Sequence, residues 1–334
     1  MDVVLANINV LAADTGFSGA VRVDAPGSGS WEAAYGLAHR GHMFANTTST
    51  RFGLASIAKG FTALTVASLI EDGVLAFETT ARSLLGNDLP LIDDRVTIKH
   101  LMANRSGIGD YLDEDAGGDI LDYVMTLPVH QLIDAESYLP MLEGHAQKFA
   151  PHTDFAYCNG GFVVLALLAE RASGVSYYDL VRQRVCEPAG LTQTAFLRND
   201  ELGGDVATNY LSEDGLRTNA LHLPVRGVGD GGITSTLTDL HTFWTSLIDG
   251  RIVSPAMAAT MTSAHSTGCT PSRDYGLGFW LVRDSGALML QGYDAGVSAC
   301  TVHVPARHIT HTVISNSTDG AWPITARLDE LLGT

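Results

Sequence analysis

Ser56-Ile57-Ala58-Lys59 stands at the head of a long apolar run and sets the expectation for the rest of the chain. A serine and a lysine three residues apart share one face of a helix, so the amine lies beside the hydroxyl. That pair is the minimum requirement for a serine nucleophile that is activated by a lysine. The chain holds three lysines, and neither Lys99 nor Lys148 follows a serine at this spacing.

The residues after Ser56 predict a buried helix that ends near Gly73. Apolar side chains such as Phe61 and Leu64 cover nearly all of its circumference, which is typical of a helix inside a core. Burial disfavours the charged form of an amine, so we expect the pKa of Lys59 to be lowered toward neutrality. The alternative is that Ser56 only caps the helix and that Lys59 is a solvated side chain.

A second candidate element is Tyr157-Cys158-Asn159, directly before a strongly apolar helical run that ends before Gly174. A phenol that meets the cationic Lys59 would have a depressed pKa and could shuttle protons. The Asn159 amide could donate to a substrate carbonyl or hold the lysine in place. Alternatively, Tyr157 is a partly buried aromatic residue and Asn159 a helix cap.

Composition excludes some classes of partner. The 334 residues are 46% hydrophobic and 17% charged, so one large domain or two moderate ones can form a core. The net charge of −17 argues against a nucleic-acid or membrane partner. No signal peptide is recognised at the N-terminus, and the four cysteines lack a CxxC pair, so we expect a cytoplasmic protein with reduced thiols.

The order of predicted elements indicates an α+β fold. Strands at both ends would form one antiparallel sheet flanked by terminal helices, and a mainly helical region would be inserted between them. We therefore expect a sheet domain from residues 1–74 and 227–334, an inserted helical domain from 75–226, and the cleft between the two. The predicted helices are 1–13, 56–72, 159–171, 238–248 and 324–332, and the predicted strands are 19–24, 31–38 (after a turn at 25–29), 276–283, 287–291, 297–304 and 309–315.

With these elements placed, the chain resembles the serine β-lactamase and penicillin-binding-protein superfamily. It is most similar to the class C β-lactamase-like branch, which includes esterases and D-amino-acid peptidases. The resembling segments are 50–63, 96–108, 151–161 and 231–240. The resemblance implies a β-lactamase/transpeptidase-like fold and no metal or cofactor. It also implies that Ser56 is the acylated nucleophile, Lys59 and Tyr157 the base and acid pair, and Asn159 a substrate-binding residue.

The third motif of that superfamily departs from its usual pattern here. Relatives carry Lys-Thr-Gly, or a His or Trp followed by Gly, on the strand that lines the cleft. The matching residues are Gln291, Gly292, Tyr293 and Asp294, which contain no cation and which we expect to bind substrate. The Asp294 N–H would be the second oxyanion donor, while Gln291 and Tyr293 could equally be an ordinary strand end. Without a cation for a substrate carboxylate, neutral esters or amides rank above β-lactams.

The leading hypothesis is a serine hydrolase that forms a covalent acyl-enzyme on a small ester or a peptide-like amide. The alternatives are β-lactamase or DD-carboxypeptidase activity, acyl transfer to an amine or alcohol, and a penicillin-binding module with slow turnover. His303, His308 and His311 alternate along the final strands. We expect them on the sheet surface rather than as metal ligands.

Overall fold

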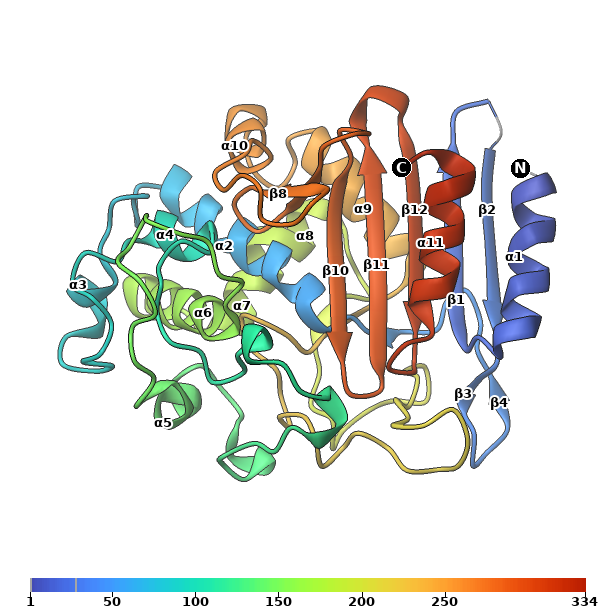
Figure 1. The fold of residues 1–334 in the computed structure, drawn as a ribbon, viewed down its shortest axis with the longest axis horizontal. Helices are drawn as coiled ribbons and strands as arrows, with labels where there is room; N and C mark the ends of the chain where they lie inside the picture. Colours follow the sequence, from blue (N-terminus) through green and yellow to red (C-terminus); the bar gives the residue numbers. More distant parts are fainter. Residues whose placement is uncertain (1, 28) are drawn as a thin grey trace.

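The computed structural model describes residues 2–27 and 29–334, and its centre is a seven-stranded antiparallel sheet with helices on both faces (Figure 1). The strand order is β2-β1-β12-β11-β10-β9-β8, which joins the two ends of the chain in one sheet as predicted. The expected α+β class is confirmed. The strands of this sheet are β1 (Gly19–Ala25), β2 (Gly29–Tyr35), β8 (Arg273–Tyr275), β9 (Trp280–Val282), β10 (Leu288–Asp294), β11 (Val297–Val304) and β12 (Ile309–Ser315).

The bounds of β11 and β12 agree with the predicted strands. Both strands are buried along their whole length, because helices cover the sheet on either side. β10 extends to Asp294, three residues past the predicted end, while β9 is shorter than predicted. The predicted turn at 25–29 includes Ser28, and the predicted first helix includes Met1, and both residues lie outside the described part of the chain.

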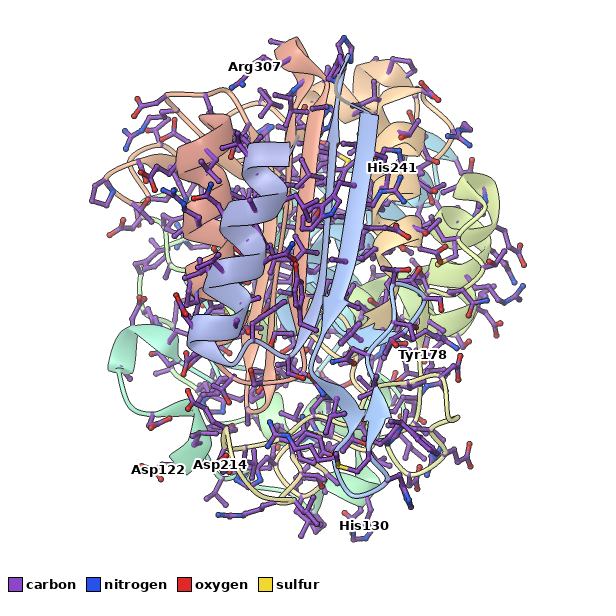
Figure 2. The ribbon with its side chains drawn as sticks, turned by 90° about the vertical axis from the view of Figure 1, so that its right-hand side faces the viewer. Asp122, His130, Tyr178, Asp214, His241 and Arg307 are labelled. Atoms are coloured by element: carbon purple, nitrogen blue, oxygen red, sulfur yellow. The ribbon has the colours of Figure 1, made fainter. Side chains whose placement is uncertain are left out.

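Two helices from opposite ends of the chain, α1 and α11, lie side by side on one face of the sheet (Figures 1 and 2), and α9 packs on the other face. The predicted helices at 1–13, 56–72, 159–171, 238–248 and 324–332 correspond to α1, α2, α6, α9 and α11. The α-helices are α1 (Asp2–Thr15), α2 (Ala58–Glu71), α3 (Ala81–Leu85), α4 (Ile98–Met102), α5 (Leu139–Leu142), α6 (Asn159–Ser173), α7 (Tyr177–Val181), α8 (Glu187–Ala189), α9 (Leu237–Ile248), α10 (Pro255–Met261) and α11 (Ala321–Leu332).

Short turns of tighter or wider helix connect these elements. The 3-10 turns are η1 (Ala55–Ile57), η2 (Glu114–Ala116), η3 (Ile120–Asp122), η4 (Val129–Gln131), η5 (Glu136–Tyr138) and η7 (Pro305–Arg307), and the π turn is η6 (Arg182–Cys186). The inserted region from 75 to 226 is thus mostly short helices and loops, as predicted.

The central helix α2 is buried on all sides from Ala58 to Leu69, which its sequence predicted. It packs against α6, whose residues from Asn159 to Ala169 are equally buried. α6 ends at Gly174 in the left-handed conformation, which glycine adopts without a steric cost. The two helices give the Ser56–Lys59 segment a rigid apolar surrounding.

A small three-stranded sheet, in the order β5-β7-β6, fixes the entry into α2. Its strands are β5 (Phe52–Gly53), β6 (Ala195–Phe196) and β7 (Ile233–Ser235), and a separate ribbon pairs β3 (Leu37–His39) with β4 (Phe44–Ala45). Because β5 pairs with β7, the segment before Ser56 lies against the loop that precedes Ile233. That loop contains Asp230.

The expected surface position of the strand histidines is wrong for two of the three. His303 stacks on Trp244 of α9 with ring centroids 5.8 Å apart, and His311 lies 3.0 Å from the Asp329 carboxylate of α11. Both rings are buried because helices cover both faces of the sheet, so alternation along a strand exposes neither set of side chains. Only His308, in the turn after η7, is exposed as expected.

The predicted division into two domains stays a prediction. One hydrophobic core contains residues from both predicted parts, among them Leu64, Leu165 and Ile314. The four cysteines are free thiols. Among the described residues, no helix has both the length and the apolar character needed to cross a bilayer.

Candidate active site

Ser56 lies in the 3-10 turn η1, directly before the first residue of α2, and not at an α-helix cap as the alternative reading supposed. The turn is held from behind, since the Leu54 N–H donates to the Ile233 carbonyl at 2.9 Å. Ala55 has a φ of +45°, a left-handed conformation that side chains other than glycine rarely adopt. This strained residue turns the half-buried Ser56 toward the cavity described below.

The Lys59 amine has three oxygen neighbours and almost no contact with solvent. Its Nζ lies 2.8 Å from Ser56 Oγ, 2.7 Å from Asn159 Oδ1 and 2.9 Å from the Asp230 carbonyl oxygen. Two of these oxygens are pure acceptors, and the third belongs to a hydroxyl that can also donate. A neutral amine would therefore donate to Asn159 and Asp230 and direct its lone pair at the Ser56 hydroxyl. The contacts select Ser56 as the proton donor to Lys59.

Burial lowers the pKa of Lys59, as the sequence predicted. The side chain is only 1% exposed, and the charged form loses its hydration there. The negative charges of Asp230, Glu114 and Asp110 act in the opposite direction and hold the pKa up. Burial outweighs them, so the net shift favours the free amine that a base requires.

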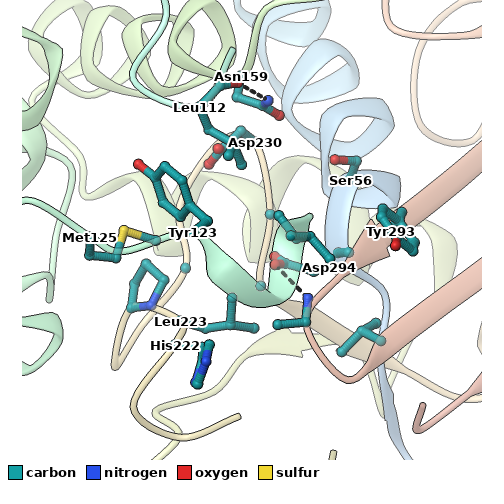
Figure 3. A pocket seen from close by; sticks show the side chains of 18 of the residues that line it. Ser56, Leu112, Tyr123, Met125, Asn159, His222, Leu223, Asp230, Tyr293 and Asp294 are labelled. Carbon is teal, nitrogen blue, oxygen red and sulfur yellow. Dashed lines mark hydrogen bonds between the residues drawn. The ribbon is translucent and has the colours of Figure 1, made fainter. Parts of the chain in front are cut away.

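Asn159 holds the lysine in a fixed orientation. Its Nδ2 donates to the Leu112 carbonyl at 2.8 Å and lies 3.2 Å from Glu114 Oε1, so its Oδ1 must face Lys59 (Figure 3). The Asp110 carboxylate accepts the backbone N–H groups of Asn159 and Gly160 at 2.6 and 2.8 Å. Asp110 thereby anchors the start of α6 and with it the amide that positions the base.

Tyr157 joins the site, but the expected depression of its pKa is wrong. Burial, reinforced by the charge of Glu114, raises the pKa of the phenol well above 10, and a hydrogen bond with Ser56 opposes this only in part. The Lys59 amine lies over the ring face, 4.8 Å from its centroid, and Trp280 stacks on the ring with centroids 5.8 Å apart. The phenol therefore stays neutral and can only donate its proton.

The third-motif strand β10 runs against the turn that carries Ser56. A side chain on Gly292 would collide with the Leu54 carbonyl oxygen and would lie 3.0 Å from the Ser56 nitrogen. Glycine at this position therefore allows the close approach of strand and turn. Tyr293 and Asp294 line the cavity beside Ser56 (Figure 3), whereas Gln291 does not.

The motif itself contains no cation, as the sequence indicated, and the structure places one cation next to it but outside the cavity that Ser56 faces. Arg273 of β8 donates from Nη1 to Gln291 Oε1 at 3.0 Å. The arginine lies 18 residues earlier in the chain and reaches Gln291 only because β9 brings β8 next to β10. Within the described residues no acidic side chain pairs with Arg273.

Sequence reasoning missed several residues of the site. Asp110 and Asp230 are buried beside Lys59, and the Tyr111 hydroxyl donates to the Asp230 carboxylate. The only local signal was the position of Asp110 and Tyr111, just after the Ser106-Gly107 loop of the resembling segment. Burial raises the pKa of Asp110 to about 6 and also raises that of Asp230.

A cavity of about 670 Å³ opens in front of Ser56. The η1 turn and β10 form one wall, and the loop from Asp110 to Met125 forms the other. A third side comes from the loops around Leu223 and Asp230 (Figure 3). The space is large enough for a small ligand, and Ser56 and Asn159 face it together.

A half-buried serine hydroxyl, a buried lysine base and a neutral tyrosine donor at one end of such a cavity define a serine hydrolase. The chain belongs to the beta-lactamase family, whose model matches residues 5–333. The recognition made from the sequence motifs is confirmed.

Individual relatives are penicillin-binding proteins and D-aminopeptidases. Penicillin-binding protein 4* of Bacillus subtilis is 28% identical over 80% of this chain and 60% of its own length. A D-aminopeptidase of Brucella anthropi is 32% identical over 70% of this chain and 43% of its own. The chain thus spans less than two thirds of either relative. The crystal structure of a penicillin-binding protein from Bacillus halodurans superposes with a TM-score of 0.91 at 30% identity, covering 97% of this chain and 99% of that one.

Proposed function

We propose that this serine hydrolase forms a covalent acyl-enzyme at Ser56 and cleaves small esters or peptide-like amides. The observation that carries the proposal is the set of three contacts at Lys59 Nζ, which leaves the lone pair of a neutral amine directed at Ser56 Oγ. The similarity to a D-aminopeptidase supports an amide or peptide substrate.

In the proposed first step, Ser56 Oγ attacks the substrate carbonyl carbon while its proton moves to Lys59 Nζ. The oxyanion would be stabilised by the backbone N–H groups of Ser56 and Asp294, and the close packing of β10 on η1 supports this pairing. The neutral Tyr157 phenol donates a proton to the leaving oxygen or nitrogen as the bond breaks, and it regains a proton from Lys59. Water then attacks the ester at Ser56 by the reverse sequence of proton transfers.

The test is burst kinetics with p-nitrophenyl butyrate, followed by intact mass measurement, on the wild type and on Ser56→Ala. We expect turnover and a butyryl adduct of the wild type only. Ester hydrolysis at an unchanged rate by a folded Ser56→Ala variant would refute the proposal.

A second candidate is acylation by β-lactams or by peptides that end in a carboxylate. The similarity to penicillin-binding protein 4* of Bacillus subtilis favours it, although Arg273, the cation nearest the third motif, lines a separate pocket beside Asp329 and not the Ser56 cavity. Incubation with benzylpenicillin and intact mass measurement tests it. A stable adduct on the wild type that is missing from Ser56→Ala would support this reading, and the absence of any adduct would oppose it.

A further inference from the structure

The cavity in front of Ser56 has an unusual distribution of charge. Seven acidic side chains line it, and no lysine or arginine is present among its lining residues in the described chain. Several like charges in a partly enclosed space create a negative potential that favours a cationic ligand. The question is which of these carboxylates are free to bind one.

Most of the carboxylates near the base already have partners within the protein. Asp110 accepts two backbone N–H groups, and Asp113 forms an ion pair with Lys148 at 2.6 Å. Asp230 accepts the hydroxyl of Tyr111. These groups support the fold and the orientation of the lysine, and their hydrogen-bonding capacity is largely used.

Asp294 differs from them. Its carboxylate accepts one hydrogen bond, from the backbone N–H of the next residue, Ala295, at 2.9 Å (Figure 3). No basic side chain in the described part of the chain forms an ion pair with it. Burial, reinforced by the negative charges of Asp230 and Glu114, raises its pKa to about 7, and the hydrogen bond from Ala295 and the charge of Lys59 oppose this only in part. It is a half-buried acid without a counter-ion.

The position of Asp294 relative to the nucleophile is also specific. Alternate residues of a strand lie on the same face, so the Asp294 side chain follows Gly292, which packs on the backbone of Leu54 and Ser56. Across the cavity, Glu114 lies 3.2 Å from the Asn159 amide that holds Lys59. An acyl group bonded to Ser56 would extend into the space that these two carboxylates border.

We propose that the substrate carries a free ammonium group on its acyl portion, and that Asp294 binds this group with Glu114 as a second carboxylate partner. The substrate class is then aminoacyl amides, aminoacyl esters or peptides with an unblocked N-terminus. This inference rests on the proposed acyl-enzyme chemistry only for the location of the acyl group. A charge-assisted hydrogen bond in a partly enclosed site discriminates strongly against an analogue that lacks the charge.

The experiment measures binding without turnover, by calorimetry at pH 7 on the Ser56→Ala variant. The ligands are the two enantiomers of phenylalaninamide, whose amino group is largely protonated at this pH, and 3-phenylpropanamide, which lacks only that amino group. We expect one enantiomer to bind at least about tenfold more tightly than 3-phenylpropanamide. Adding Asp294→Asn should remove that preference, and adding Glu114→Gln should reduce it.

The control is Asp214→Asn in the same background, since it makes the same charge change at an exposed loop residue away from the cavity. It should leave the preference intact, with circular dichroism confirming the fold of each variant. Equal binding of 3-phenylpropanamide and both cationic ligands to Ser56→Ala would overturn the proposal. So would a preference that survives Asp294→Asn unchanged.

The binding experiment on Asp294 and the ester-turnover experiment on the proposed function can fail independently of each other. Serine-dependent turnover of p-nitrophenyl butyrate tests the acyl-enzyme chemistry with an uncharged acyl group. Turnover of that ester without any preference for the cationic ligands would retain the hydrolase and reject the role of Asp294. A preference for the cationic ligands without ester turnover would retain Asp294 as the ammonium site and reject the proposed hydrolysis of simple uncharged esters.

Discussion

The α2–α6 side and the β10 side of the site, which meet at Ser56, are built in opposite ways. On the α2–α6 side, Lys59 is buried and each oxygen near its amine has a defined hydrogen-bonding role. On the β10 side, Asp294 has one backbone hydrogen bond and no cationic partner among the described residues. The protein thus holds Lys59, which is expected to move protons, in a fixed orientation by its own hydrogen bonds. Asp294, which is expected to bind substrate, keeps free hydrogen-bonding capacity for a ligand.

The largest effect on activity is expected on the α2–α6 side of the site, from Lys59→Met. Removing the base should lower kcat/KM by about 10³-fold or more. The same change leaves Asn159 Oδ1 and the Asp230 carbonyl oxygen without their buried donor, so the free energy of unfolding should fall by about 1–3 kcal/mol. Ester kinetics and urea unfolding measure the two quantities. Lys99→Met, at an exposed lysine, is the control and should alter neither. A Lys59→Met variant with near wild-type activity would remove lysine from the mechanism.

The pH dependence of kcat/KM also tests the role of Lys59 as the base. Because the pKa of Lys59 is lowered by burial, kcat/KM should rise with pH and level off below 10.5, the ordinary value of a lysine. The measurement is the initial rate of ester hydrolysis across the alkaline range, corrected for spontaneous hydrolysis. A midpoint at or above the ordinary value would contradict the burial argument.

The contact between β10 and the η1 turn that carries Ser56 is tested by Gly292→Ala. The added methyl collides with backbone atoms of Leu54, so β10 must move away from η1. A displacement of this kind should lower kcat by about 10²-fold, since acyl transfer depends on the placement of the oxyanion donors. Gly204→Ala is a matched control, because nothing lies near its added methyl. Equal activity of the two variants would show that β10 does not shape the reacting geometry.

The Asp294 carboxylate on the β10 side has no ion-pair partner among the described residues, so its charged form should lower the stability of the fold. Asp294→Asn measures that loss. The folded pKa of about 7 lies above the ordinary 3.8, so the folded state holds the proton more tightly and stability falls as pH rises from about 4 to about 7. The variant should be more stable than the wild type by about 1–3 kcal/mol at pH 8, and the gain should vanish near pH 4. Thermal unfolding across this range is the measurement, with Asp214→Asn as control. A pH-independent difference would contradict the assignment.

The smallest effect is expected at the turn itself, from Ala55→Gly. Glycine adopts the observed φ of +45° without the steric cost of a Cβ, so the free energy of unfolding should rise by about 0.5 kcal/mol. Ala58→Gly in α2 makes the same change at an ordinary helical φ and should lower stability by about 0.5–1 kcal/mol. Urea denaturation of both variants decides the matter, and equal losses would mean that Ala55 is not strained.

The sequence predicted those parts of the site and fold that local spacing determines. Ser56 and Lys59 are one helical turn apart, and β11 and β12 are uninterrupted runs bounded by turn residues. It did not predict Asp230 or Arg273, because their contacts depend on strand pairing between distant segments. The pKa of Tyr157 was predicted with the wrong sign, since the sequence gives the neighbouring charge but not the burial that outweighs it.

The pairing of β1 with β12 has a consequence for the order in which the molecule assembles. Ser18 Oγ donates to Asn316 Oδ1 at 2.7 Å, a contact that joins residues 298 positions apart. During synthesis, β1 and β2 must therefore wait for the last strand before they can enter the main sheet. Long-range pairing of this kind slows folding and leaves strand edges exposed in the meantime. A ribosome-bound chain that stops before residue 309 would lack β12, the strand that joins β1 to β11, and would hold the sheet in two unconnected parts.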